Sequence, residues 1–148
     1  MRKQVVTPDT LFPASYMDIL MQLVEEQGVD ANKILSNYHL TRQQLQDPLF
    51  NLPLNTSAYI TGLSIILCEC PELGFLFGER MHLASHGDLG IAALSGQTYE
   101  QALDVVMRYS QTRVPYLKIQ SRYDGDYVRV QFIEVIDLGP IRIFCIEA

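Results

Sequence analysis

Two arginines and two tyrosines in the second half of the chain have the side chains best suited to hold a ligand. Arg108, Tyr109, Arg113 and Tyr116 follow one another closely. Guanidinium groups bind carboxylates and phosphates through paired hydrogen bonds, and tyrosine rings line many small-molecule pockets. The four residues are therefore candidates for binding an anionic small molecule. A structural interpretation, which we favour, places the arginines at a helix C-terminus, where the dipole attracts cations, and the tyrosines in the core.

A second group of residues has the spacing of metal ligands. Glu79, His82 and His86 would share one face if a single helix carried them. A glycine follows at once, however, and no further Cys or His cluster completes a four-ligand set. Cys68 and Cys70 are two residues apart, so on a helix they point to different sides. We therefore expect no metal site.

The motifs of common catalytic and cofactor sites are absent from the sequence. Ser85, His86 and Asp88 lie too close along the chain to assemble a triad, and there is no Gly-x-Ser-x-Gly elbow. Neither Gly-x-Gly-x-x-Gly nor a Gly-Lys-Ser/Thr phosphate loop occurs. The glycines of Gly87-Asp88-Leu89-Gly90 are instead interpreted as the residues of a sharp turn. We expect neither an enzyme nor a cofactor.

The N-terminal half reads as a set of helices. Ser15 is expected to cap a first helix that stops at Gly28, and Asp30 to cap a short second one. Thr41 with Gln44 three residues later predicts a capping box. A strongly apolar helix over Thr56–Cys70 and another from Leu73 to near Gly87 follow.

The pattern changes to strands after a helix that Thr98 caps, with Gln101 at the box position. Apolar and polar residues alternate from Leu117 and again from Val128, and Asp124-Gly125 predicts a hairpin turn between them. Ile141, Ile143 and Cys145 predict a third strand. The fold class expected is α+β, an N-terminal helical cluster followed by an antiparallel meander of three or more strands. A sheet of three strands with one apolar face is stable only if another element packs against that face. We therefore expect this sequence to be a fragment of a longer chain.

Composition limits the class of protein. The chain has 148 residues, of which 48% are hydrophobic and 19% charged, so it should fold around one core. A net charge of -6 argues against a surface built to neutralise phosphates. The sequence shows no signal-peptide core or membrane span, and its three cysteines suggest no disulfide framework. We expect a cytoplasmic protein.

The most specific pattern is a series of short motifs in a fixed order. They are Pro71-Glu72-Leu73-Gly74, Gly78-Glu79-Arg80, Gly87-Asp88-Leu89-Gly90-Ile91-Ala92, Thr98, Ala102-Leu103 and Arg108-Tyr109, preceded by Gly28-Val29-Asp30, Leu45, Asp47-Pro48 and Leu52-Pro53. Their order and spacing resemble the N-terminal effector-binding domain, of the arabinose-binding type, found in AraC/XylS-family bacterial transcription regulators. The likeness extends from Leu20 to Tyr127.

The resemblance implies a domain that senses a small molecule and controls a C-terminal pair of helix-turn-helix motifs. Residues 1–148 would be one N-terminal regulatory domain, with the DNA-binding domain absent from the chain. The implied partners are an unknown effector and a second copy in a homodimer, while DNA would be bound only through the absent domain. No ligand-contact residue is carried over from the family, and its name does not identify the effector.

A different class of function remains open beside the sensor. The apolar helices over 56–70 and 74–83 are more hydrophobic than a surface helix requires, so they suit a core, a pocket wall or a dimer face. If they bury against a partner and no small-molecule cavity exists, the chain is a pure oligomerisation or protein-interaction module. A cavity and a bound effector would separate the sensor from this alternative.

Overall fold

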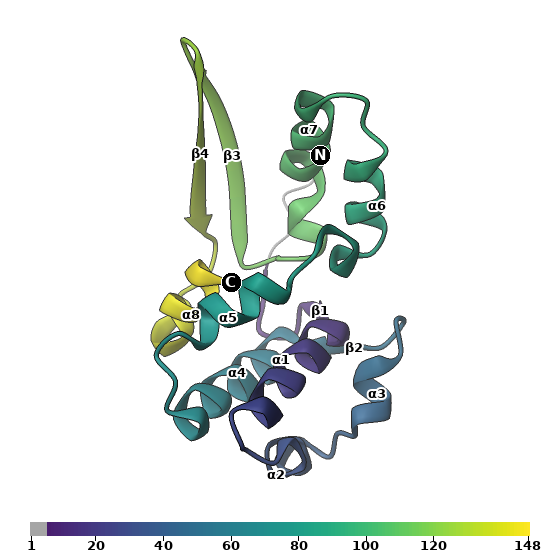
Figure 1. Cartoon of the computed structure of the whole chain (residues 1–148), viewed down its shortest axis with the longest axis vertical. Coiled ribbons are helices and arrows are strands. Elements are labelled where there is room, and N and C mark those ends of the chain that lie inside the picture. The colour runs from purple at the N-terminus through teal and green to yellow at the C-terminus, as the bar shows by residue number, and fades with distance from the viewer. Residues whose placement is uncertain (1–5) are drawn as a thin grey trace. The chain divides into compact units, whose positions relative to one another are not determined.

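The computed structural model describes residues 6–148, which form two compact units that are treated separately below (Figure 1). The helical unit consists of Thr7–Met81 with Gly139–Ala148, and the hairpin unit is built mainly from His82–Leu138. Each unit contains helices and one two-stranded antiparallel sheet. The predicted α+β class is thereby confirmed, and the grouping of residues 1–148 into one regulatory domain stays a prediction.

The helical unit is centred on its first long helix, α1. Leu20, Met21 and Val24 of α1 are completely buried, and Ile34 and Ile60 from two other helices complete the middle of the core. The elements are β1 (Leu11–Pro13), α1 (Ala14–Glu26), α2 (Ala31–Leu35), η1 (Ser36–Tyr38), α3 (Arg42–Gln46), β2 (Asn51–Pro53), α4 (Leu54–Cys68), α5 (Leu73–Arg80), η4 (Gly139–Ile141) and α8 (Arg142–Glu147).

The predicted caps are largely confirmed. Asp30 Oδ1 accepts a hydrogen bond from the backbone N–H of Asn32 at 2.9 Å, and Gly28 has a φ of 82° after α1. Thr41 and Gln44 form the full capping box of α3. The predicted cap at Ser15 is wrong, because α1 begins at Ala14 and its N-cap position is Pro13, two residues earlier. The fixed φ of proline, rather than a side-chain hydroxyl, sets the start of this helix.

Replacing Thr41 by alanine should lower the free energy of unfolding by about 1 kcal/mol. The substitution removes the oxygen that accepts from the Gln44 N–H at 3.3 Å, while the backbone N–H of residue 41 can still donate to the Gln44 side chain. Urea unfolding followed by circular dichroism measures the change. Thr41→Ser keeps the hydroxyl and should remain within a few tenths of a kcal/mol of the parent protein, and an equal loss in both variants would refute the capping role.

Two short strands that the sequence analysis did not predict fasten the start of α1 to the start of α4. Phe12 of β1 faces Leu52 of β2 in antiparallel register, and both side chains are buried. The Leu54 N–H donates to the Thr10 carbonyl at 2.8 Å, which continues the pairing into the first residue of α4. Each strand leads directly into a helix, so this small sheet sets the spacing between the two helix N-termini.

Helix α4 has the extent of the predicted uncharged helix, shifted by two residues. It spans Leu54–Cys68 and ends because Glu69 adopts a left-handed conformation with a φ of 47°, before the predicted stop at Pro71. Within residues 6–148 no single helix is long and apolar enough to cross a membrane. Only α4 and α5 taken together reach that length and composition, and they are bent by 119°.

The C-terminal segment is a helix, so the predicted third strand over Ile141, Ile143 and Cys145 is wrong. This segment forms η4 and α8, and Phe144 of α8 packs its ring against Phe77 of α5 with centroids 5.2 Å apart. Two glycines of α5 allow this contact. A Cβ on Gly74 would lie 2.8 Å from the Phe144 Cα, and one on Gly78 would lie 2.8 Å from the Glu147 carbonyl oxygen.

The hairpin unit begins with a tight corner between a 3₁₀ helix and a short helix. Its elements are η2 (Leu83–His86), α6 (Asp88–Leu94), α7 (Tyr99–Tyr109), η3 (Ser110–Thr112), β3 (Leu117–Asp124) and β4 (Tyr127–Glu134). The predicted continuous helix from Leu73 to near Gly87 is therefore broken after Arg80. Gly87 turns the chain with a φ of 60°. Gly90 has no side chain, which lets the backbone of α6 lie close to the Leu83 carbonyl. The interpretation of the two glycines as turn residues is confirmed for Gly87, whereas Gly90 lies within α6.

Strands β3 and β4 form the predicted antiparallel hairpin. Asp124 pairs with Tyr127, so the loop consists of Gly125 and Asp126, one residue later than the predicted Asp124-Gly125. Gly125 has a φ of 62° at the first loop position, where a type II′ turn takes glycine. Among residues 6–148 no other strand pairs with this hairpin, so the predicted meander of three or more strands is reduced to two.

Candidate functional site

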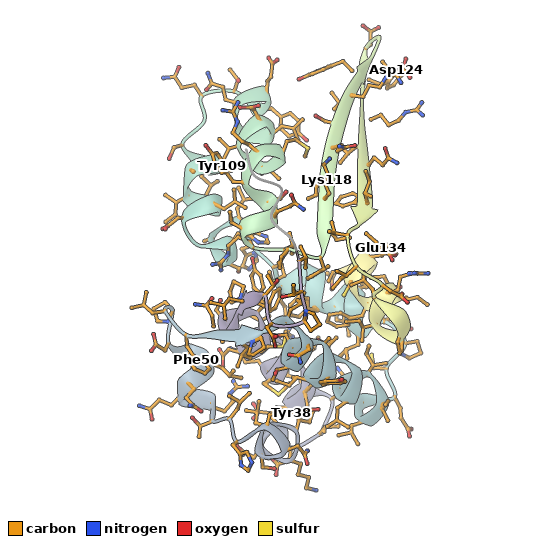
Figure 2. The ribbon with its side chains drawn as sticks, turned by 180° about the vertical axis from the view of Figure 1, so that it is seen from behind. Tyr38, Phe50, Tyr109, Lys118, Asp124 and Glu134 are labelled. Carbon is orange, nitrogen blue, oxygen red and sulfur yellow. The ribbon has the colours of Figure 1, made fainter. Side chains whose placement is uncertain are left out.

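The structure places Arg108 and Tyr109 at the C-terminal end of α7, as the helix-dipole interpretation expects. Thr98 caps this helix by accepting from the Gln101 N–H at 3.2 Å, which confirms the predicted start. Arg108 donates to Asp104, one turn earlier, at 3.0 Å. Tyr109, which is labelled in Figure 2, is half exposed, so the prediction that the tyrosines belong to the core is wrong for this residue.

Arg113 and Tyr116 lie in the connection between η3 and β3, and both are half-buried. The Tyr116 carbonyl accepts from the Val135 N–H at 2.9 Å, which joins this connection to the end of β4. The backbone of Arg113 is fixed by a hydrogen bond from its N–H to the Ser110 carbonyl at 2.9 Å. The backbone at Tyr116 is therefore tied to a distant part of the chain, whereas the hydrogen bond of the Arg113 N–H is local.

The Arg113 guanidinium lies over the glycine turn that precedes α6. The three heavy atoms nearest to a Cβ on Gly87 would all belong to this guanidinium, each at 3.7 Å. Gly87 combines a φ of 60° with a ψ of -136°, a conformation that L-residues rarely adopt. The guanidinium of Arg113 therefore lies beside the backbone of Gly87, which has no side chain to keep it away. His86, the residue before Gly87, is close enough to feel the charge of the same guanidinium.

His86 and Arg113 together give this place its electrostatic character. Burial lowers the pKa of the half-buried imidazole, and the positive charge of Arg113 lowers it further. Near neutral pH the imidazole is therefore uncharged and can accept a hydrogen bond, while the guanidinium beside it carries the positive charge. The Arg113 guanidinium could bind a carboxylate, and the neutral His86 imidazole could exchange a hydrogen bond with a second polar group. The pair is therefore suited to a small molecule that carries both groups.

The pKa of His86 predicts a pH dependence of stability. Because the folded pKa lies below the ordinary value of 6.5, the unfolded chain binds more protons in the interval between the two pKa values. Stability should be full above pH 6.5 and fall as the pH drops through that value toward the folded pKa. Urea unfolding between pH 5 and 8 should show a shallower acid loss for His86→Gln. Equal slopes in the two proteins would contradict this prediction.

The association of His86 with Arg113 was missed by the sequence analysis, which considered His86 as a metal ligand and as a member of a catalytic triad. His82 lies at the N-cap of η2 instead, where its N–H donates to Ser85. Within the described part of the chain no group of three or more His, Cys, Asp or Glu side chains could hold a metal ion. The available signal was Gly87 itself, whose lack of a side chain leaves room for a long neighbour.

Comparisons with known proteins agree with the resemblance seen in the sequence. A family model described as the arabinose-binding domain of AraC transcription regulators, N-terminal, matches residues 28–148. The chain is also similar to the ornithine utilization regulator of Pseudomonas aeruginosa, with 26% identity over 137 residues. That alignment covers 93% of this chain and 40% of the regulator, so the chain spans less than half the length of this relative. The chain therefore belongs to the family of N-terminal arabinose-binding domains of AraC transcription regulators, a family of regulatory effector-binding domains and not of enzymes.

Proposed function

We propose that this chain is the effector-sensing part of an AraC-type transcription regulator and that it works as a homodimer. The observation that carries the proposal is the family match over residues 28–148. DNA would be bound by a C-terminal helix-turn-helix domain outside residues 1–148, because the chain itself has a net charge of -6. Effector binding changes the output only if the effector prefers one of two arrangements of the regulator.

We place the effector at the connection between η3 and β3. Arg113 is the proposed carboxylate partner, because its backbone is fixed and it lies beside the half-buried His86. Tyr116, Tyr109 and Arg108 are proposed to contact the effector farther from its carboxylate. Arg108 can do so only after its ion pair with Asp104 breaks. The name of the Pseudomonas aeruginosa relative makes amino acids the first compounds to try, since each has a carboxylate and a second polar group.

Thermal unfolding and titration calorimetry with millimolar L-ornithine, other amino acids and small carboxylates test the sensor. A compound present at a hundredfold excess over its Kd should stabilise the fold by about 2.7 kcal/mol. Arg113→Gln should abolish this gain. Arg129→Gln, which removes an exposed arginine from β4, should preserve it. The absence of a shift with every compound, or an unchanged shift in Arg113→Gln, would refute the sensor or its site respectively.

The oligomerisation module is kept as a second candidate because of one observation. Val128, Val130 and Phe132 of β4 expose 40%, 40% and 63% of their surface in the chain. Exposed apolar residues gathered on one strand mark an interaction surface more often than a random scatter does. A stable dimer that binds none of the compounds above would favour this candidate over the sensor.

A further inference from the structure

Two buried serine hydroxyls have no hydrogen-bond partner in the described part of the chain. Three buried side-chain oxygens there lack one, and they belong to Asp18, Ser57 and Ser110. The Asp18 carboxylate is nevertheless paired, because its Oδ1 lies 3.1 Å from a guanidinium nitrogen of Arg42. Buried polar groups are normally hydrogen-bonded, and an unpaired one costs free energy. The hydroxyls of Ser57 and Ser110 therefore require an explanation.

The hydroxyl of Ser110 differs from other hydroxyls at comparable places in this chain. Thr61, Ser64 and Ser95 each donate to the backbone carbonyl one helical turn earlier, at 2.8 or 2.9 Å. Ser110 directly follows α7, and its N–H bonds to the Val106 carbonyl in the same way. Its side chain makes no such bond. Ser110 therefore keeps an unused donor and acceptor inside the hairpin unit.

The 3₁₀ turn η3 sets the side chains of Ser110 and Arg113 on the same side of the chain. The Arg113 N–H donates to the Ser110 carbonyl at 2.9 Å, which closes this turn. Side chains three residues apart eclipse each other in a 3₁₀ helix. The unpaired hydroxyl and the guanidinium therefore project from one face of η3. Ser57, by contrast, lies on a face of α4 that consists of core residues such as Ile60 and Ser64.

We propose that the Ser110 hydroxyl is a second partner of the effector's carboxylate, donating to one carboxylate oxygen while the Arg113 guanidinium binds the other. A carboxylate has enough acceptor sites for both donors, whereas a carboxamide offers one oxygen and no charge. The inference rests on the effector site proposed above. It adds a specificity-determining residue and narrows the effector to molecules with a free carboxylate.

The burial of Ser110 also makes binding depend on a change of arrangement. Ser110 is 3% exposed and its hydroxyl oxygen has almost no accessible surface, so nothing that packs on the outside of the hairpin unit can pair with it. A small molecule reaches the hydroxyl only after the side chains that cover it move. The effector therefore prefers an opened arrangement over the closed one of the free protein, and such a preference is what a sensor needs to transmit binding.

Alanine variants test the unpaired hydroxyl in the free protein. Ser110→Ala should keep or raise the urea midpoint of the parent protein, because the substitution removes a buried polar group without breaking a hydrogen bond. Ser57→Ala is the matched control, since it removes the other unpaired hydroxyl, and it should behave in the same way. A lowered midpoint in Ser110→Ala would show that the hydroxyl is already paired, for example by a buried water, and would overturn the inference.

Acetate tests the carboxylate contact without knowledge of the effector. Sodium acetate is titrated into ¹⁵N-labelled protein against sodium chloride of equal ionic strength, and the amide signals of residues 110–114 should shift and saturate in the parent protein. Ser110→Ala should raise the Kd for acetate about tenfold or more, because a hydrogen bond to a charged group is lost. Ser57→Ala should bind acetate like the parent protein, and acetamide should give no saturable shift.

The outcomes separate this inference from the function on which it rests. No saturable shift with acetate in the parent protein, or an equal Kd in Ser110→Ala, overturns the role of Ser110. The sensor survives that result if a compound from the panel above still stabilises the parent protein. If acetate binds through Ser110 and no compound from the panel does, the carboxylate contact holds and the sensor is refuted.

Discussion

Gly90→Ala is expected to destabilise the hairpin unit by about 3 kcal/mol. A Cβ at this buried position would lie 1.7 Å from the Leu83 carbonyl oxygen and 2.6 Å from its carbonyl carbon. Both atoms belong to backbone, so no side-chain rotation relieves the overlap and α6 must separate from η2. Helix propensity alone would favour alanine by about 1 kcal/mol, which is too little to offset the displacement.

Hydrogen exchange read by mass spectrometry locates the effect of this substitution. Peptides from residues 83–94 should lose protection in Gly90→Ala, and urea unfolding should shift to lower midpoints. Ala92→Gly is the matched control in the same helix, because Ala92 is exposed and glycine there costs about 1 kcal/mol through propensity. A Gly90→Ala protein as stable as the parent would show that α6 and η2 do not pack as described.

Elements whose signals are local could be predicted from the sequence. The Thr41 box, the Asp30 and Thr98 caps and the Gly125 turn all depend on residues within four positions of one another. Such interactions form wherever the chain allows them, whatever packs against the element. The helices they bound were accordingly placed to within a few residues.

Elements that depend on distant partners could not be predicted. Strands β1 and β2 are three residues long and exist only because they pair across the intervening helices. In η4 and α8, alternating Ile141, Ile143 and Cys145 suggested a strand, because a short apolar run does not distinguish strand from helix. The residue that decides is Phe144, which the alternation treated as outward-facing and which is buried against α5.

For the candidate site, the sequence suggested some of the residues that lie together but not the link between them. Residue types suitable for an anionic ligand made Arg113 and Tyr116 candidates, and the structure adds their surroundings. His86 could not be joined to them, because the link runs through the backbone geometry of Gly87 rather than through spacing along the chain. Arg108 was grouped with them by residue type and sequence proximity, and it forms an ion pair with Asp104.

The same substitution should have opposite effects at two helical glycines of the helical unit. A Cβ on Gly74 would lie 2.8 Å from the Phe144 Cα and 2.9 Å from its carbonyl oxygen, so α5 would be pushed from α8. A Cβ on Gly62 of α4 would meet only the Ile141 Cγ2, at 3.7 Å, which is ordinary contact. Gly74→Ala should lose about 2 kcal/mol, and Gly62→Ala should gain about 0.5 kcal/mol.

Urea unfolding of both variants measures the two effects, because each helix contributes to the same unit. Alanine restricts the unfolded chain and favours the helix equally at both positions, so these terms cancel in the comparison. The difference in unfolding free energy therefore reports the close approach of α8 to α5 alone. If Gly74→Ala were as stable as Gly62→Ala, α8 would not rest on the glycine face of α5, and the helical assignment of residues 142–147 would lose its physical explanation.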